Sequence, residues 1–190
     1  MEKPPLVSLA QKAVETFIKE KEIISAPPDF PKKFLERKSG VFVSIHNKKE
    51  NCLRGCIGTF LPSQENIATE VIKNAISAAT QDSRFLPIKK EELPFLSYTV
   101  YILNPPQLIK DLSELNPKKY GIIVKTAPPA ATPKTGLLLP DLEGIDTVEK
   151  QIFIACQKAG INLEKEKILI YKFSVEKYEE NGQKRKKEKT

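Results

Sequence analysis

The sequence predicts an α+β protein with a mixed or antiparallel sheet and about three helices. Segments with strand periodicity occur next to short polar turns, a pattern typical of β-hairpins. Three segments with helical periodicity are interleaved with about six such strands, without the regular βαβ alternation of a doubly wound sheet. We find no internal repeat and no change in composition that divides the chain before its basic end.

Two of the predicted helices lie in the first half of the chain. The first covers residues 6–18, follows two prolines and carries apolar residues at helical spacing. The second has Ser63 as its expected N-cap and Glu65 in its first turn, and its apolar stripe continues to about Thr80.

The third predicted helix begins at a cap formed by Asp146 or Thr147 and is closed by Gly160 at the C′ position. Cys156 falls on its apolar stripe, where a small buried residue is expected. The predicted strands cover residues 41–46, 52–60, 98–103, 120–126, 136–139 and 167–175.

The formal net charge of +7 is concentrated at one end of the chain. Residues 181–190 contain five positive charges and one negative charge, a net of +4, which leaves +3 for the other 180 residues. We therefore expect one domain over residues 1–179 and a basic, disordered tail over residues 180–190. Nucleic-acid binding is not expected beyond nonspecific binding by this tail.

The sequence predicts a cytoplasmic protein without a membrane partner. It contains no apolar run of about 18 residues and no pattern of a secretory signal peptide. Its three cysteines are too few and odd in number for a disulfide framework.

Residues 53–58, with the sequence Leu-Arg-Gly-Cys-Ile-Gly, are the most informative segment. Arg54 and Cys56 are two residues apart in a predicted strand, and each is followed or preceded by a glycine. Glycine weakens a strand interior, so Gly55 and Gly58 indicate a bulge, a bend or a close approach by a ligand or another backbone.

A hairpin turn centred on Lys49 predicts that Cys56 lies opposite Phe42, with Arg54 on the same face of the sheet. His46, the only histidine, is then four residues along the strand from the partner of Cys56, or about 13 Å. Since a nucleophile and its base must be roughly 3 Å apart, this spacing disfavours a Cys56–His46 pair. Cys52 is equally far from Cys56, so we expect no metal site. We also expect no cofactor.

Two interpretations of Cys56 stay open. A guanidinium close to the sulfur lowers the pKa of a thiol and favours a nucleophilic thiolate. Alternatively, Cys56 packs as a small residue in a crowded strand, since free cysteines are usually buried.

A second motif follows the second predicted helix and contains Asp82, Arg84 and Phe85. If Arg84 approaches Arg54, the two guanidiniums form a pocket suited to a carboxylate or phosphate group. In the alternative interpretation Asp82 stabilises the turn and pairs with Arg84, and Phe85 anchors the loop in the core.

Four motifs occur here in the same order as in the AMME chromosomal region (AMMECR-type) domain family, whose prokaryotic members are called AmmeMemoRadiSam system protein A. They are residues 53–58, residues 82–87, Gly136-Leu-Leu-Leu-Pro140 and Lys158-Ala-Gly160. The resemblance extends to about Glu179, and the motif at 53–58 is very specific to the family. Residues 141–146 depart from the family pattern, and the chain has no tryptophan.

The resemblance implies an α+β fold with a larger and a smaller lobe and a cleft between them near residues 53–58. It also implies an association, by gene context, with Memo-type and radical SAM proteins. It implies no established reaction, because the molecular activity of the family is not settled.

We therefore predict a cleft-based binding or accessory module that recognises an anionic small molecule, a peptide or a partner protein. A cysteine-dependent enzyme acting on an anionic substrate and a nucleic-acid-binding protein are the alternatives, and whether the protein is an enzyme stays open. The candidate catalytic residue is Cys56, and the candidate binding residues are Arg54, Gly55, Gly58, Asp82, Arg84 and Phe85.

Overall fold

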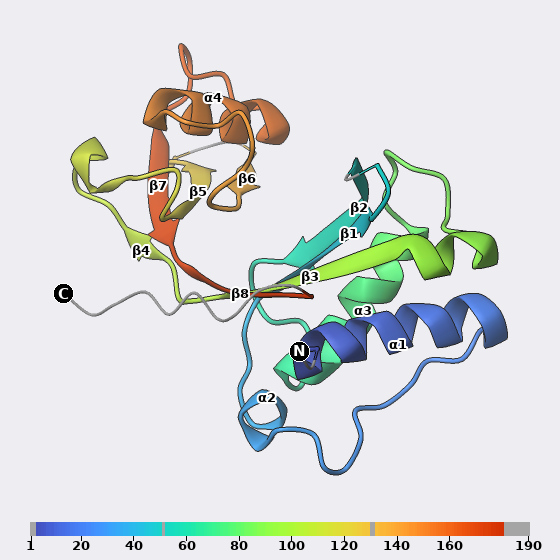
Figure 1. Cartoon of the computed structure of the whole chain (residues 1–190). Coiled ribbons are helices and arrows are strands. Elements are labelled where there is room, and N and C mark those ends of the chain that lie inside the picture. Colours follow the sequence, from blue (N-terminus) through green and yellow to red (C-terminus); the bar gives the residue numbers. More distant parts are fainter. Residues whose placement is uncertain (1–2, 51, 130–131, 181–190) are drawn as a thin grey trace. The chain divides into compact units, whose positions relative to one another are not determined.

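The computed structural model describes residues 3–50, 52–129 and 132–180 and confirms the α+β fold (Figure 1). The chain forms two compact units. Unit 1 contains the residues up to Leu103 and those from Glu176 onward, and unit 2 contains Asn104–Val175. The predicted basic tail at 181–190 lies outside the described residues. Within the described ranges, no helix is both long enough and apolar enough to cross a bilayer.

Unit 1 is a four-stranded sheet with helices on one face (Figure 1). The strand order is β2-β1-β3-β8, and β1 is antiparallel to both β2 and β3. Its elements are α1 (Pro5–Glu20), α2 (Lys32–Leu35), β1 (Val41–Asn47), β2 (Cys52–Thr59), α3 (Ile67–Thr80), the 3-10 helix η1 (Lys90–Phe95), β3 (Leu96–Leu103) and β8 (Val175–Glu179).

The core of unit 1 lies between this sheet and the helices α1 and α3. Alternate residues of β1 and β3 are fully buried and face the apolar stripes of the two helices. They are Val41, Val43, Ile45, Tyr98, Val100 and Ile102. The intervening residues of β1, which include Ser44 and His46, therefore lie on the opposite face, called the outer face below.

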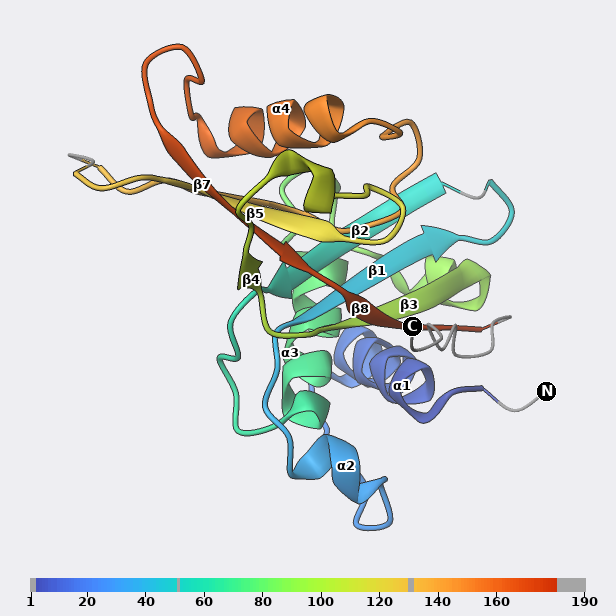
Figure 2. The same cartoon turned by 90° about the vertical axis from the view of Figure 1, so that its left-hand side faces the viewer.

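Unit 2 is a second four-stranded sheet with the order β4-β7-β5-β6, in which β7 is antiparallel to β4 and β5, and β5 to β6. Figure 2 shows α4 lying along this sheet. Cys156 of α4 is 1% exposed in its core, as expected. The elements are β4 (Gln107–Leu108), the 3-10 helix η2 (Leu112–Glu114), β5 (Gly121–Thr126), β6 (Thr135–Leu138), α4 (Val148–Ala159) and β7 (Ile168–Phe173).

The two ends of unit 2 are tied together by its first and second-last residues. The N–H of Asn104 donates to the carbonyl oxygen of Ser174 at 2.9 Å. The side-chain amide of Asn104 donates to the hydroxyl oxygen of Ser174 at 2.8 Å. The chain therefore enters and leaves unit 2 at the same place.

The prediction of one strand over 167–175 was wrong. The segment is divided at Ser174 into β7 and β8, which belong to different sheets. Periodicity reports that a segment is extended but does not identify the strand with which it pairs. The helices at the two ends of the sequence are confirmed, including the Thr147 cap and the left-handed Gly160 that ends α4.

The predicted start of α3 was also wrong. Its N-cap is Asn66, whose side chain accepts a hydrogen bond from the N–H of Thr69. Ser63 lies before the helix and binds Glu70 through its N–H and its hydroxyl group, at 2.7 and 2.9 Å. Ser63 therefore donates its hydrogen bonds to the buried carboxylate of Glu70 and does not cap the helix.

Glu70 is fully buried and fixes the loop between β2 and α3. Besides the two bonds from Ser63, its carboxylate accepts hydrogen bonds from the Thr59 hydroxyl at 2.7 Å and the Gln64 N–H at 2.8 Å. Burial alone would raise the pKa of Glu70, but these hydrogen bonds outweigh it and lower the pKa.

Replacing Glu70 by Gln should lower the free energy of unfolding by about 3 kcal/mol, because an amide donor then meets groups that are themselves donors. Since the folded-state pKa of Glu70 is lowered, its contribution is present at neutral pH and is lost as the pH falls below the ordinary glutamate pKa of about 4.3. Urea unfolding of the variant at pH 7 and pH 3 tests both points. The exposed Glu65→Gln variant is the control and should change stability by less than about 0.5 kcal/mol.

Candidate functional site

The hairpin of β1 and β2 has a different register from the predicted one. Cys56 pairs with Ser44, and Phe42 pairs with Gly58. The register shifts between Ile45, which pairs with Gly55, and His46, which pairs with Leu53, so Arg54 is an extra residue in β2. This β-bulge is one of the irregularities that glycine in the motif indicated.

Three small residues form a row across the outer face of the sheet. Ser44 of β1 pairs with Cys56 of β2 on one side and with Thr99 of β3 on the other. Ser44 is only 4% exposed, and its hydroxyl donates to the sulfur of Cys56 at 3.2 Å. The group that contacts the sulfur is thus a hydroxyl, which sequence reasoning did not single out.

The observed register brings His46 closer to Cys56 than predicted. His46 is two residues along β1 from Ser44, the partner of Cys56, which corresponds to about 7 Å instead of 13 Å. Burial and the positive charge of Lys177 lower the pKa of His46. This spacing is still larger than the roughly 3 Å that a nucleophile and its base require, so a Cys56–His46 pair stays disfavoured.

The two glycines of the motif allow close contacts within unit 1. A Cβ atom on Gly55 would lie 2.1 Å from the carbonyl oxygen of Ala78 in α3. A Cβ atom on Gly58 would lie 2.2 Å from the ring of Phe42 on the outer face. Both positions therefore exclude larger residues for packing reasons, while their part in ligand binding stays a prediction.

Arg54 projects from the bulge toward the segment that follows α3. Its Nε and Nη2 donate to the two carboxylate oxygens of Glu92, at 2.7 and 3.0 Å. Its Nη1 donates to the carbonyl oxygen of Leu86 at 2.7 Å, and Nη2 also reaches that of Pro87 at 3.4 Å. These bonds lower the pKa of Glu92 and hold residues 86–92 against β2.

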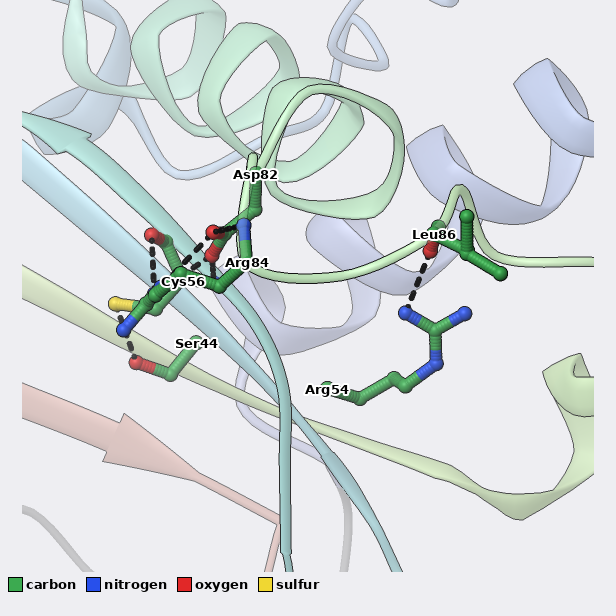
Figure 3. A network of polar contacts seen from close by, with 6 residues as sticks. All are labelled: Ser44, Arg54, Cys56, Asp82, Arg84 and Leu86. Atoms are coloured by element: carbon green, nitrogen blue, oxygen red, sulfur yellow. Dashed lines mark hydrogen bonds and ion pairs between the residues drawn. The ribbon is translucent and has the colours of Figure 1, made fainter.

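Arg84 pairs with a different carboxylate from the one that binds Arg54. Its Nε donates to one oxygen of Asp82 at 2.9 Å and its Nη2 to the other at 2.6 Å. Figure 3 shows the Arg84 guanidinium beside Asp82 and the Arg54 guanidinium beside Leu86. The two arginines are therefore bound to separate partners, as in the interpretation that pairs Asp82 with Arg84.

Asp82 and Arg84 together bind the backbone of Cys56. The N–H of Cys56 donates to Asp82 at 2.8 Å, and Arg84 Nη2 lies 3.4 Å from the Cys56 carbonyl oxygen. Because β2 is the edge of the sheet, this ion pair satisfies groups that a further strand would otherwise bind. The guanidinium bonds, opposed by burial and aided by the Cys56 N–H, lower the pKa of Asp82 to about 2.

Phe85 does not anchor the loop in the core, contrary to one of the two interpretations. It is half-buried, and the Arg84 guanidinium lies 5.3 Å from its ring centroid. The anchor is Ile88, which is 3% exposed and whose N–H donates to the carbonyl oxygen of Ala79 at 2.8 Å. Leu86 is 78% exposed beside Phe85.

The other cysteines differ from Cys56 in environment. Cys52 is exposed, and its hydrogen bond to Glu50 raises the pKa of its thiol. Burial raises the pKa of Cys156. In the described parts of the chain, no three histidine, cysteine or acidic residues form a group that could hold a metal ion.

The AMMECR1 family model matches residues 7–178, which is nearly the whole chain. The chain belongs to the AMMECR1 family. A protein of Thermotoga maritima is 45% identical over 174 residues, which cover 92% of this chain and 97% of the relative. The crystal structure of the uncharacterized protein PH0010 from Pyrococcus horikoshii has the same fold, with a TM-score of 0.81, 34% identity and coverage of 93% of this chain and 90% of that chain.

The family domain also occurs within a longer protein. Protein CA_C1420 of Clostridium acetobutylicum is 42% identical to 95% of this chain, but the match covers only 37% of that protein. The chain therefore spans little more than a third of this relative.

Sequence reasoning missed the partners of the candidate residues. Ser44 and Thr99 depend on strand register, and Glu92 is one of two adjacent glutamates in a polar segment. The only available signal for Glu92 was the general rule that a largely buried arginine needs a carboxylate.

Replacing Arg54 by Lys should lower the free energy of unfolding by about 2 kcal/mol, because an ammonium group cannot bind Glu92 and the loop carbonyl together. Urea unfolding measures the change. Arg37→Lys is a matched control, since Arg37 binds Glu176 at the same 2.7 Å but both side chains are over a third exposed. Its effect should stay within about 1 kcal/mol, and equal losses in both variants would contradict the bracing role of Arg54.

Proposed function

We propose that this AMMECR1-family protein is a binding or accessory module whose partner contacts residues 84–86, called the Arg84 surface below. On the family resemblance, Memo-type and radical SAM proteins are the first candidate partners. The observation that carries the proposal is that hydrogen bonds of Asp82 and Arg54 hold the two ends of this segment. The side chains of Arg84 and Leu86 are nevertheless exposed.

The chemistry of the Arg84 surface is that of a recognition site. The Arg84 side chain is 56% exposed although Asp82 binds one edge of its guanidinium. Phe85 under the guanidinium and the exposed Leu86 add apolar area next to the charge. Arginine and aromatic residues surrounded by apolar contacts are typical of interface hot spots.

The rigidity of this segment favours binding. Asp82 fixes its start through Arg84 and the backbone of Cys56, and Arg54 fixes Leu86 and Pro87. A segment that is already ordered loses little conformational entropy when a partner binds. In this proposal Arg54 and Asp82 position the surface, and Arg84 makes the contact.

The relative in Clostridium acetobutylicum supports an accessory role. There a domain similar to this chain is joined to further sequence in one polypeptide. A domain that occurs both alone and as part of a longer chain is expected to act together with other proteins.

The test measures the affinity of purified Memo-type and radical SAM proteins from the same host for the wild-type chain and for Arg84→Ala and Leu86→Ala. We expect at least one protein to bind and each substitution to weaken binding about tenfold or more, because hot-spot truncations lose about 2 kcal/mol. The exposed Lys73→Ala on α3 is the control, and it should bind as the wild type does. Unchanged affinity of both variants would contradict the Arg84 surface, and absence of binding by either protein would contradict the partner assignment.

A cysteine-dependent enzyme is a second candidate because one contact favours it. The Ser44 hydroxyl donates to the Cys56 sulfur, and Cys56 is half-buried next to the Asp82–Arg84 pair. A hydrogen bond donated to sulfur and a neighbouring guanidinium are features of reactive cysteines.

Alkylation rates at neutral pH separate the two candidates. If Cys56 only packs, iodoacetamide should modify the exposed Cys52 faster than the half-buried Cys56. If Cys56 is a nucleophile, it should react first, and Ser44→Ala should slow it. Peptide mass spectrometry of timed samples gives the order, with the buried Cys156 as an unreactive reference.

A further inference from the structure

The outer face of the unit 1 sheet carries a cavity of about 640 Å³ that the proposed function does not use. Strands β1, β3 and β8 line it, together with residues at the ends of β1 and β8. A volume of this size lies in the range of small-molecule sites. The lining residues used here are His46, Ser97, Thr99, Tyr101, Lys177 and Glu179.

The observed register explains why these side chains meet. His46 pairs with Ser97, and Thr99 pairs with Ser44, so the floor of the cavity continues into the row that ends at Cys56. Thr99 is half-buried in this floor, and its hydroxyl can donate a hydrogen bond. A polar floor with an available donor is suited to a polar ligand.

The two lysines of the cavity form ion pairs with its two glutamates, and the pair of Lys177 is the exposed one. Lys177 contacts Glu179 at 2.7 Å, and both side chains are about two-fifths exposed. Lys48 contacts Glu180 at 3.0 Å, and Glu180 also contacts Lys3. Exposed ion pairs contribute little, so an incoming anion can replace Glu179 as the partner of Lys177.

His46 lies half-buried in the same cavity, where burial and Lys177 disfavour its protonated form. The charged groups that face this cavity are Lys48, Lys177, Glu179 and Glu180. An anion bound between His46 and Lys177 would compensate the charge of Lys177 and stabilise protonated His46. A neutral or cationic ligand would do neither.

We propose that this cavity binds a small molecule through a carboxylate or phosphate group, held by His46 and Lys177 with the Thr99 hydroxyl as a further donor. The site shares no residue with the Arg84 surface. Because binding raises the pKa of His46, it takes up a proton there, and affinity rises as the pH falls below the pKa of the bound form toward the lower pKa of the free form.

The only histidine of the chain provides a direct readout, because its imidazole gives a single set of NMR signals. The titration of His46 is followed in the full chain with sodium acetate or inorganic phosphate, and with sodium chloride at equal ionic strength. We expect acetate or phosphate to raise the pKa of His46 by about 1, as expected for an opposite charge within a few ångströms. The probe that does so at the lower concentration assigns the carboxylate or the phosphate class.

Two variants make the test specific. Lys177→Gln should raise the pKa of His46 in the free protein, because a neighbouring positive charge is removed, and should abolish the response to the anion. Lys73→Gln, on a helix of the opposite face, should respond as the wild type does. The proposal is overturned if neither anion exceeds the effect of chloride, or if Lys177→Gln responds as strongly as the wild type.

Discussion

The carboxylate of Asp82 is the constraint on which the arrangement around residues 53–58 depends. It accepts a hydrogen bond from the backbone of Cys56 and two from Arg84, and so joins the end of α3 to the free edge of β2. Its lowered pKa shows that the ionised form is strongly favoured in the folded chain. Arg54 holds the other end of the same segment through Glu92 and Leu86. Asp82 and Arg54 therefore act within the protein, and they hold the segment of residues 82–87 between them.

The sequence was informative where local chemistry decides the structure. Apolar periodicity located α1 and α4, with two prolines before the first and the Thr147 cap at the start of the second. Two glycines in a strand correctly indicated close packing and an irregular register. The sequence was misleading where residues distant along the chain decide the structure. One extra residue at Arg54 changed the partner of Cys56 from Phe42 to Ser44, and a buried Glu70 removed Ser63 from its expected role as a cap. Glu92 and Thr99 could not be found at all, because their importance arises only from the register and from the path of the chain after α3.

The row of Cys56, Ser44 and Thr99 connects two features that are far apart in the sequence. Cys56 belongs to the family-specific motif, whereas Thr99 lines the cavity that contains His46. The buried hydroxyl of Ser44 between them contacts the sulfur directly. The cavity is therefore lined by His46 on β1, the strand that pairs with the strand of Cys56, and by Thr99 on the strand after it. The motif at residues 53–58 therefore lies between the Arg84 surface and the strands that line the cavity.

The two hydrogen bonds between Asn104 and Ser174 have a consequence for the evolution of the chain. Strands β3 and β8 are neighbours in one sheet, yet unit 2 is inserted between them as one continuous segment. Because the ends of the insert are joined by two hydrogen bonds, its length and surface can change without altering the strand order of the host sheet. A short turn in place of residues 104–174 would join β3 directly to β8. The motif with Cys56 and the second sheet can therefore diversify at different rates within one gene.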